Sequence, residues 1–552
     1  MKRHLLIGSL LVSALSFGQT LKSAITKTQN ERFRDAIVEF HKLTVADPTN
    51  GENYYYLGNC YFEKEEIDSA KMMWKKSFEV DKLRALPLVA QGRILWVDGK
   101  SVEAKAEFTK ALALVKKDKL KRAEVLRAIA DVYIKSPVKN LDEAIILLDE
   151  AILKDPTNEE NYLLKGDALY ARNSSDASEA LKAYNKVLEI NPKSPRGIVS
   201  KALIYQRARN QVEANKMYIQ AKEIDPTYAP AYRLNAELCM MFNRNAEAIE
   251  NWKKYLELNN NMESRMRYAN ALYSAKEWCV LIPELDVLVA GGINNYFIDR
   301  FYAFAYYGCT TDSLGTDKGI AASDRFFTKV PQDKINYQDY KLRGQLFVKK
   351  GNDSLAMIAY EQAINLNELG YKEVSADLIK MYGKNKKYEK LISAYEQRRK
   401  INGKLTAPEE YDLGKAYYSG RNDYKTADSI FQIVIKNDST YVPAYIYRGR
   451  SNYKMDTNNE KWLAFPHYLK VTEIVKPEER QEKSKRAFVL EALRYVADYY
   501  SKSPSKDLVK AKFYFEEILK VEPTDANAKK ALGIKDPVPT PAPGTPSTTP
   551  RH

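Results

Sequence analysis

Cysteine is scarce in this chain of 552 residues, which contains only Cys60, Cys239, Cys279 and Cys309. None of them belongs to a CxxC pair, and their spacing fits no common zinc site, so a fold built on disulfides or on a structural metal is excluded. Cys60 and Cys239 fall on apolar helical stripes and are expected in the core. Cys279 and Cys309 fall near two neighbouring predicted turns, where a disulfide and a pair of free thiols both remain open.

Histidine is equally scarce, with four residues in the chain, and no HExxH or similar metal-binding spacing occurs. A GxSxG nucleophile elbow and a GxGxxG dinucleotide fingerprint are also missing. Gly99, Lys100 and Ser101 imitate the end of a phosphate-binding loop, but Ile94 stands where its first glycine belongs. Acidic residues are plentiful, yet no two are singled out as a general acid and base. We expect no catalytic residue, no cofactor and no metal, and an enzyme with an unfamiliar site is the least favoured interpretation.

Long apolar runs are missing beyond the N-terminus, which reads MKRHLLIGSLLVSALSFGQT. This stretch has a basic start, an apolar run from Leu5 to Leu15, and small residues up to Gly18. It is too short to span a bilayer comfortably and is typical of a secretory signal peptide. We predict a signal peptide over residues 1–18. Export would place the mature protein in the periplasm or at the outer membrane of a Gram-negative-type envelope, or outside the cell.

Acidic residues are outnumbered, with 72 Asp and Glu against 87 Lys and Arg, so the formal net charge is +15. A positive charge favours acidic partners but says nothing about the fold. Because the chain carries an export signal, nucleic acid is not an expected partner. The 23 glycines and 22 prolines are too few for a fibrous or disordered chain, and 45% of residues are apolar, so a folded protein is expected.

What the chain does contain is a recurring helical pattern, shown most clearly between Pro192 and Pro226. Apolar and small residues fall at four- and three-residue steps on two short stripes, which predicts two amphipathic helices. A polar break around Arg209 separates the stripes, and Ala202 and Ala214 allow the two helix backbones to approach closely. This stretch is therefore expected to form one helical hairpin.

The same hairpin pattern repeats along the chain, mostly at intervals of 34 residues. The start of each second helix carries a small residue, at Ala36, Ala70, Ala104, Ala144, Ala180, Ala214, Ala248, Ala322 and Ala356. A large residue follows four positions later, at Phe40, Trp74, Phe108, Leu148, Tyr184, Tyr218, Trp252, Phe326 and Tyr360. First helices carry their own small residue at Gly58, Gly92, Gly166, Ala202, Ala236, Gly344, Gly414 and Gly449.

This pattern resembles the tetratricopeptide repeat family, whose 34-residue unit has small residues at positions eight and twenty and a large one at twenty-four. Gly58, Ala70 and Trp74 occupy those places in one unit. The resemblance implies an all-α fold, an α-solenoid of about fourteen helical hairpins that wind into a right-handed superhelix. One hairpin cannot bury both of its apolar stripes, so each depends on its neighbours.

One interruption suggests how the array is divided. Between Cys279 and Pro331 the repeat is distorted, and we expect an extended turn from Gly308 to Gly319. We therefore predict an N-terminal array over residues 19–290 and a C-terminal array over residues 291–533 that ends in a short capping helix. A Pro- and Thr-rich tail over residues 534–552 can build no core and is expected to be disordered.

The resemblance also suggests a binding surface, because the first helices of this family line a concave groove. Transferred by register, the candidate groove residues are Arg93, Arg196, Arg207, Arg233, Arg267, Lys341, Lys349, Lys372, Tyr411, Lys415 and Arg450. They predict a cationic, aromatic groove suited to acidic or extended segments of partner proteins. For each one, the alternative is an ordinary solvated side chain.

The main hypothesis is a non-enzymatic scaffold or adaptor of the cell envelope that binds partner proteins during envelope assembly or secretion. It follows from the resemblance alone. The alternative is a binder of an anionic envelope glycan or lipid surface, for which a basic segment from Lys380 to Lys404 is the second candidate surface. The sequence names neither the partner nor the oligomeric state.

Overall fold

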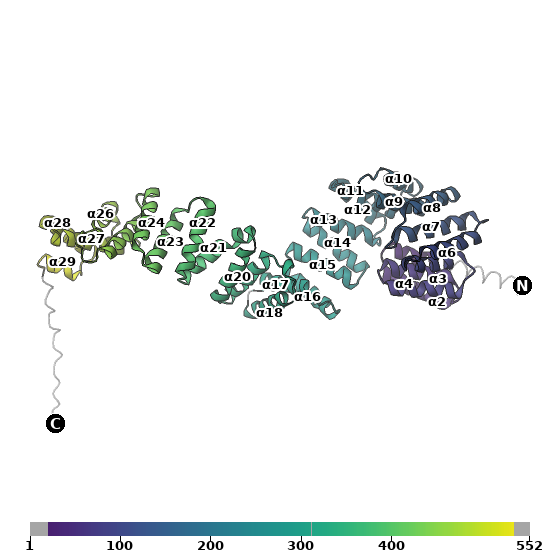
Figure 1. Cartoon of the computed structure of the whole chain (residues 1–552), viewed down its shortest axis with the longest axis horizontal. Coiled ribbons are helices and arrows are strands. Elements are labelled where there is room, and N and C mark those ends of the chain that lie inside the picture. The colour runs from purple at the N-terminus through teal and green to yellow at the C-terminus, as the bar shows by residue number, and fades with distance from the viewer. Residues whose placement is uncertain (1–19, 311, 535–552) are drawn as a thin grey trace, which may run out of the picture. The chain divides into compact units, whose positions relative to one another are not determined.

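Helical hairpins make up the structure throughout the part of the chain that it describes. The computed structural model describes residues 20–310 and 312–534, and all regular elements within these ranges are helices. The predicted signal peptide and the predicted tail beyond Ile534 lie outside these ranges. The described residues form two compact units, unit 1 up to Lys329 and unit 2 from Val330 (Figure 1). The boundary expected at residues 290 and 291 lies inside unit 1.

Unit 1 begins with a helix over residues 20–29, which is followed by α2 to α18. Their bounds are α2 (Phe33–Ala46), α3 (Gly51–Glu63), α4 (Ile67–Val80), α5 (Ala85–Val97), α6 (Ser101–Leu114), α7 (Lys119–Lys135), α8 (Leu141–Lys154), α9 (Glu159–Arg172), α10 (Ser178–Ile190), α11 (Pro195–Arg207), α12 (Gln211–Ile224), α13 (Ala229–Met241), α14 (Asn245–Leu258), α15 (Met262–Ala275), α16 (Trp278–Ala290), α17 (Tyr296–Cys309) and α18 (Ser313–Lys329).

Unit 2 continues the same alternation of first and second helices, with a short helix at its end. Its elements are η1 (Gln332–Lys334), α19 (Tyr337–Lys349), α20 (Asp353–Leu366), α21 (Glu368–Lys384), α22 (Tyr388–Asn402), α23 (Ala407–Ala416), η2 (Tyr417–Arg421), α24 (Tyr424–Asn437), α25 (Val442–Met455), α26 (Phe465–Ile474), η3 (Pro477–Glu479), α27 (Arg486–Lys502), α28 (Leu508–Val521) and α29 (Ala526–Ala531). The consecutive pairing confirms the predicted α-solenoid, and α29 occupies the place of the predicted capping helix.

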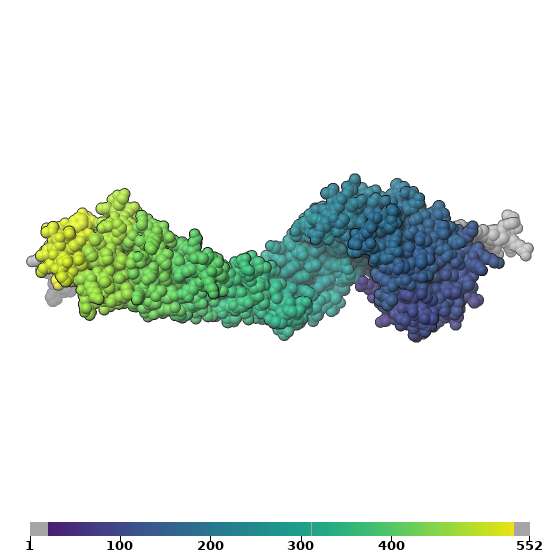
Figure 2. Space-filling view, turned by 45° about the horizontal axis from the view of Figure 1, so that its top comes forward, coloured from purple at the N-terminus to yellow at the C-terminus, as the bar shows by residue number. Residues whose placement is uncertain are grey.

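The small residues of the first helices touch the large residues of the second helices, as the repeat pattern predicts. A Cβ built on Gly58 would lie 2.3 Å from the Trp74 ring, and one on Gly166 would lie 2.3 Å from the Tyr184 ring. Gly449 meets Tyr468 in the same way in unit 2. These positions lack a side chain because the ring of the partner helix fills the space. Side chains pack closely between successive hairpins of each unit (Figure 2).

One prediction within unit 1 is wrong. The extended turn expected from Gly308 to Gly319 is largely helical, because α17 continues to Cys309 and α18 begins at Ser313. The Asp312 side chain accepts a hydrogen bond from the backbone N–H of Gly315 at 2.6 Å and so caps the new helix. Gly315 is buried against Thr310, which leaves no room for a Cβ. The glycines in this stretch therefore serve close packing and not an extended turn.

Candidate functional site

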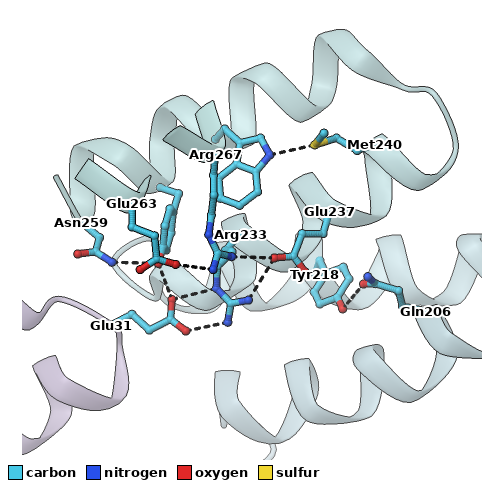
Figure 3. A network of polar contacts seen from close by, with 11 residues as sticks. Glu31, Gln206, Tyr218, Arg233, Glu237, Met240, Asn259, Glu263 and Arg267 are labelled. Atoms are coloured by element: carbon cyan, nitrogen blue, oxygen red, sulfur yellow. Dashed lines mark hydrogen bonds and ion pairs between the residues drawn. The ribbon is translucent and has the colours of Figure 1, made fainter. Parts of the chain in front are cut away.

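Unit 1 closes on itself, because its N-terminal turn contacts α13 and α14. Glu31 lies in the turn before α2 and accepts hydrogen bonds from Nε and Nη2 of Arg233, at 3.2 and 2.8 Å (Figure 3). The hydroxyl of Tyr255 donates to the same carboxylate at 2.9 Å. Beside this pair, Asn30 donates to Asp225 at 3.0 Å. We call Glu31, Arg233 and Tyr255 the clasp, since they join residues 202 and 224 positions apart.

The closed path of unit 1 surrounds a cavity of about 500 Å³, which we call the chamber. It is lined from the helix over residues 20–29 and the turn after it, and from α2, α3, α7, α9, α11 and α13. Its charged lining residues are Glu31, Glu63, Glu124, Asp131 and Glu160, together with Arg127, Lys135, Arg196 and Arg233. The chamber is therefore balanced in charge and not cationic, in contrast to the groove that the sequence predicts.

Three predicted arginines of unit 1 are held by acids that the repeat pattern does not reveal. Arg196 pairs with Glu160 one repeat earlier. Burial opposes the charge of the Arg233 guanidinium, but the Glu31 carboxylate outweighs it and raises the pKa of Arg233. Arg93 is fully buried: its Nη1 donates to Asp131 at 2.9 Å, and its guanidinium lies 4.5 Å from the Phe62 ring centroid. These three arginines stabilise unit 1.

Other predicted groove residues lie apart on the first helices and remain near the surface. Arg207 is exposed and its guanidinium lies 5.3 Å from the Tyr170 ring centroid. Arg267 is half-exposed and pairs with Glu237 and Glu263. In unit 2, Lys341 and Lys372 pair with Glu373 and Glu368 at 2.7 and 2.6 Å, while Lys349 is exposed. The structure does not gather these five residues into one site.

Three predicted residues do come together, on α23 and α25 of unit 2. The Lys415 Nζ lies 4.7 Å from the Tyr411 ring centroid, and the Arg450 guanidinium lies 5.0 Å from the Tyr447 ring centroid. Tyr447 connects the two cations, because its ring lies 5.7 Å from Tyr411 and 5.5 Å from Tyr418. We call Tyr411, Lys415, Tyr418, Tyr447, Arg450, Tyr453 and Tyr495 the aromatic groove.

The aromatic groove opens into a depression of about 660 Å³. Arg450 donates two hydrogen bonds to Glu491, at 2.9 and 2.6 Å, and Tyr468 donates to the same carboxylate at 2.8 Å. Burial and the Glu491 carboxylate raise the pKa of Tyr468, so its phenol stays neutral. Tyr453, on the same helix as Arg450, is 39% exposed, and its ring lies 6.1 Å from Tyr495. The groove thus combines a fixed polar floor with accessible aromatic faces.

A local irregularity in the first helix places one wall of this groove. The α-helix α23 passes into a π-helical segment over Tyr417–Arg421, a form that is frequent at functional sites. The segment includes Gly420, which packs so closely on Tyr388 that an added Cβ would lie 2.2 Å from that side chain. Tyr418 belongs to this segment and faces Tyr447.

Sequence reasoning missed several residues of the groove. Tyr453 stands at the twelfth position of its repeat, where the family resemblance already favours ligand contact. Arg494 and Tyr495 follow a long irregular connection before α27, so the repeat register was lost there. Glu491 could not be predicted, because it is an acidic residue and the sequence predicted a cationic surface.

The cysteines divide as the stripes predict, and the open pairing is resolved. Cys60 and Cys239 are fully buried free thiols. Cys279 and Cys309 form a disulfide that joins the start of α16 to the end of α17, with 5.1 Å between their Cα atoms. Across residues 20–310 and 312–534, no cluster of three acidic, histidine or cysteine side chains could hold a metal ion. None of the helices in these ranges has the length and apolar character to cross a membrane.

The fold defines the class of this protein: it is an α-solenoid of paired helices, with the first helices along a concave face. The 34-residue register and the contacts between small residues and rings are those of tetratricopeptide repeats. Proteins of this family generally act as non-catalytic scaffolds for protein interactions.

Comparisons with known proteins give partial matches. No family profile matches the chain. The heat shock protein sti1 homolog of Schizosaccharomyces pombe is 28% identical over 200 residues, which is 34% of this chain and 30% of that protein. Small glutamine-rich tetratricopeptide repeat-containing protein 2 of Mycosarcoma maydis is 30% identical over 95 residues, 17% of this chain and 27% of that protein. The matches span less than a third of either relative.

Among solved structures, the C-terminal part of a TPR repeat-containing protein from Cytophaga hutchinsonii is 26% identical. It covers 48% of this chain and 98% of its own chain, with a TM-score of 0.35.

Proposed function

We propose that this protein is a non-enzymatic scaffold of the cell envelope that holds extended segments of partner proteins in the aromatic groove of unit 2. The observation that carries the proposal is the groove itself. It joins Tyr411, Lys415 and Arg450, three residues that the family register assigns to ligand contact, around accessible rings. Flat aromatic faces bind extended peptides by stacking. Lys415 and Arg450 are paired with Asp412 and Glu491, so the exposed rings, and not free cations, make the main contact with a partner.

The chamber of unit 1 is less suited to an extended partner. The clasp closes its path, and the lining cations Lys135, Arg196 and Arg233 are already bound to acids of the same chain. A ligand would have to replace these internal pairs, and a buried charge that loses its partner costs several kcal/mol. We therefore assign partner binding to unit 2 and a supporting role to unit 1.

Export is supported by the bond between Cys279 and Cys309, because disulfides persist in oxidising compartments such as the periplasm. The alternative of an anionic lipid or glycan surface finds less support. Within the basic segment from Lys380 to Lys404, Lys390 pairs with Glu361, and Arg398 and Arg399 pair with acids of α23. These internal pairs reduce the charge available to an anionic surface.

The proposal is tested by capture of partners from the native envelope fraction. We expect Tyr453→Ala combined with Tyr495→Ala to lower the recovery of partner proteins at least ten-fold relative to the unaltered chain, because stacking contributes about 1 kcal/mol or more per ring. Tyr162→Ala is the control, since Tyr162 lies on α9 of unit 1, outside the groove, where its ring packs against the core and its hydroxyl donates to the Pro156 carbonyl. Equal recovery by the groove variant and the control would contradict the proposal.

A further inference from the structure

The walls of the aromatic groove have a geometry that suits one class of peptide. Tyr447 meets Tyr411 at 85° and Tyr418 at 89°, and Tyr453 meets Tyr495 at 87°. Rings in edge-to-face contact turn their exposed faces in different directions, and the proline rings of an extended polyproline II peptide stack on such aromatic faces. The groove therefore favours proline-rich segments over helical or strand-forming ones.

Hydrogen bonding favours the same class. The hydroxyl groups of Tyr418, Tyr447 and Tyr453 make no hydrogen bond within the described residues, so each remains available to donate. A polyproline II segment has no internal hydrogen bonds, and its carbonyl oxygens are therefore free to accept. Proline lacks a backbone N–H, so few donors of such a peptide would be left without partners.

The chain itself contains a segment of this kind directly after unit 2. Residues 535–552 read KDPVPTPAPGTPSTTPRH, and every second residue from Pro537 to Pro543 is proline. At about 3.1 Å per residue, eighteen residues in this conformation reach roughly 55 Å. The aromatic groove crosses three adjacent first helices, which at about 10 Å apart span roughly 20 Å. The segment is long enough to cover the whole groove.

The segment also starts beside the groove. Arg494, which lines the depression, donates to Asp525 at 2.7 Å, and Asp525 caps the N-terminus of α29. The helix α29 covers six residues and is therefore about 9 Å long. Ile534, the last described residue, thus lies within a short helix length of the groove, and a segment attached this close has an effective concentration in the millimolar range.

We propose that the aromatic groove binds proline-rich extended peptides and that residues 535–552 of the same chain occupy it until a partner displaces them. This inference rests on the proposed function and names the class of peptide that the groove takes. It also implies that partner binding is a competition, in which an incoming segment must exceed the attached one in affinity or local concentration.

The test uses the full-length chain and a labelled peptide of the sequence PVPTPAPGTP, residues 537–546. In one variant, Pro537, Pro539, Pro541 and Pro543 are all replaced by alanine, which removes the attached competitor and leaves the groove intact. We expect the free peptide to bind this variant at least ten-fold more tightly than the unaltered chain. Adding Tyr453→Ala and Tyr495→Ala should abolish the binding, whereas adding Tyr162→Ala should not. A peptide with alanine in place of its prolines is the negative control.

Each other outcome overturns a defined part of the inference. Equal affinity for the unaltered chain and the alanine variant would show that residues 535–552 do not occupy the groove. A mass that rises with concentration for the unaltered chain, but not for the alanine variant, would place the segment in a second copy instead. Absence of peptide binding would exclude proline-rich ligands. If the proline-rich peptide does not bind, but the unaltered chain captures envelope partners and the groove variant does not, the proposed function stands and the inference alone fails.

Discussion

Replacement of Glu31 by alanine should open unit 1 at its clasp. Glu31 accepts two hydrogen bonds from Arg233 and one from Tyr255, and the Glu31 and Arg233 side chains are 21% and 23% exposed. Removing one partner costs about 1 kcal/mol or less for an exposed pair and about 3–5 kcal/mol for a buried one. Arg233 keeps a weaker contact with Glu237 at 3.3 Å. We therefore expect a loss of about 2–4 kcal/mol in the stability of the contact.

The chain provides a matched control for this change. Glu65 occupies the same turn one repeat later, and its backbone has the same left-handed conformation, with φ of 65° against 56° for Glu31. Because Glu65 is exposed, Glu65→Ala changes the same turn without breaking the clasp. Any difference between the two variants therefore reports the contacts of the Glu31 carboxylate.

Hydrogen exchange is the suitable assay, because repeat arrays open locally before they unfold globally. At 1.4 kcal/mol per factor of ten, the expected loss accelerates exchange of residues 20–46 roughly 30- to 700-fold in Glu31→Ala. Protection in unit 2 should not change. If Glu31→Ala and Glu65→Ala accelerate exchange equally, the clasp does not hold unit 1 closed and our account of its arginines is wrong.

Three further predictions concern packing, titration and the disulfide. Gly166→Ala should destabilise unit 1 by about 1–3 kcal/mol, because the new Cβ would meet a tyrosine ring. Gly383→Ala is the control: the nearest atom to its new Cβ would be 4.0 Å away, so this change should be neutral or stabilising in the same thermal melt. Burial, with a smaller effect of a nearby arginine, lowers the pKa of His467 from 6.5 to about 4. The neutral His467 side chain therefore contributes fully to stability above pH 6.5, and this contribution disappears as the pH falls toward 4. Urea titrations should show that the free energy of unfolding falls by on the order of 3 kcal/mol over that pH range, and His467→Asn should remove this fall. If the free energy of unfolding of the variant depends on pH as steeply as that of the unaltered chain, the assignment to His467 is contradicted. Cys279→Ser should lower the free energy of unfolding by about 3–4 kcal/mol, because the bond to Cys309 closes a loop of 30 residues. If neither this substitution nor a reductant changes the melting temperature, the bond does not form.

Local features of the fold follow from the sequence because they depend on residues within one repeat. Gly58 and Trp74 lie sixteen positions apart and meet as the pattern predicts. The joining of Tyr411, Lys415 and Arg450 also follows from register, since equivalent positions of neighbouring first helices stack side by side.

Features that depend on several repeats could not be predicted. The pair of Glu31 and Arg233 forms only because small rotations between repeats add up until unit 1 closes. Arg93 is buried for a similar reason, since its acid Asp131 comes from a helix 38 positions later. The register correctly placed these arginines on first helices, but it carried no information on the acids that neutralise them.

The central claim is that partners bind in the aromatic groove of unit 2. Photo-crosslinking in living cells tests this claim most directly. A photo-crosslinking phenylalanine analogue is placed at Tyr453 in the groove, and at Tyr162 in a parallel strain as the control. We predict that irradiation joins the Tyr453 position to a discrete partner protein, through a segment that is extended and rich in proline, and that the Tyr162 position gives no such product. Equal products from both positions, or a product from the control alone, would contradict the claim.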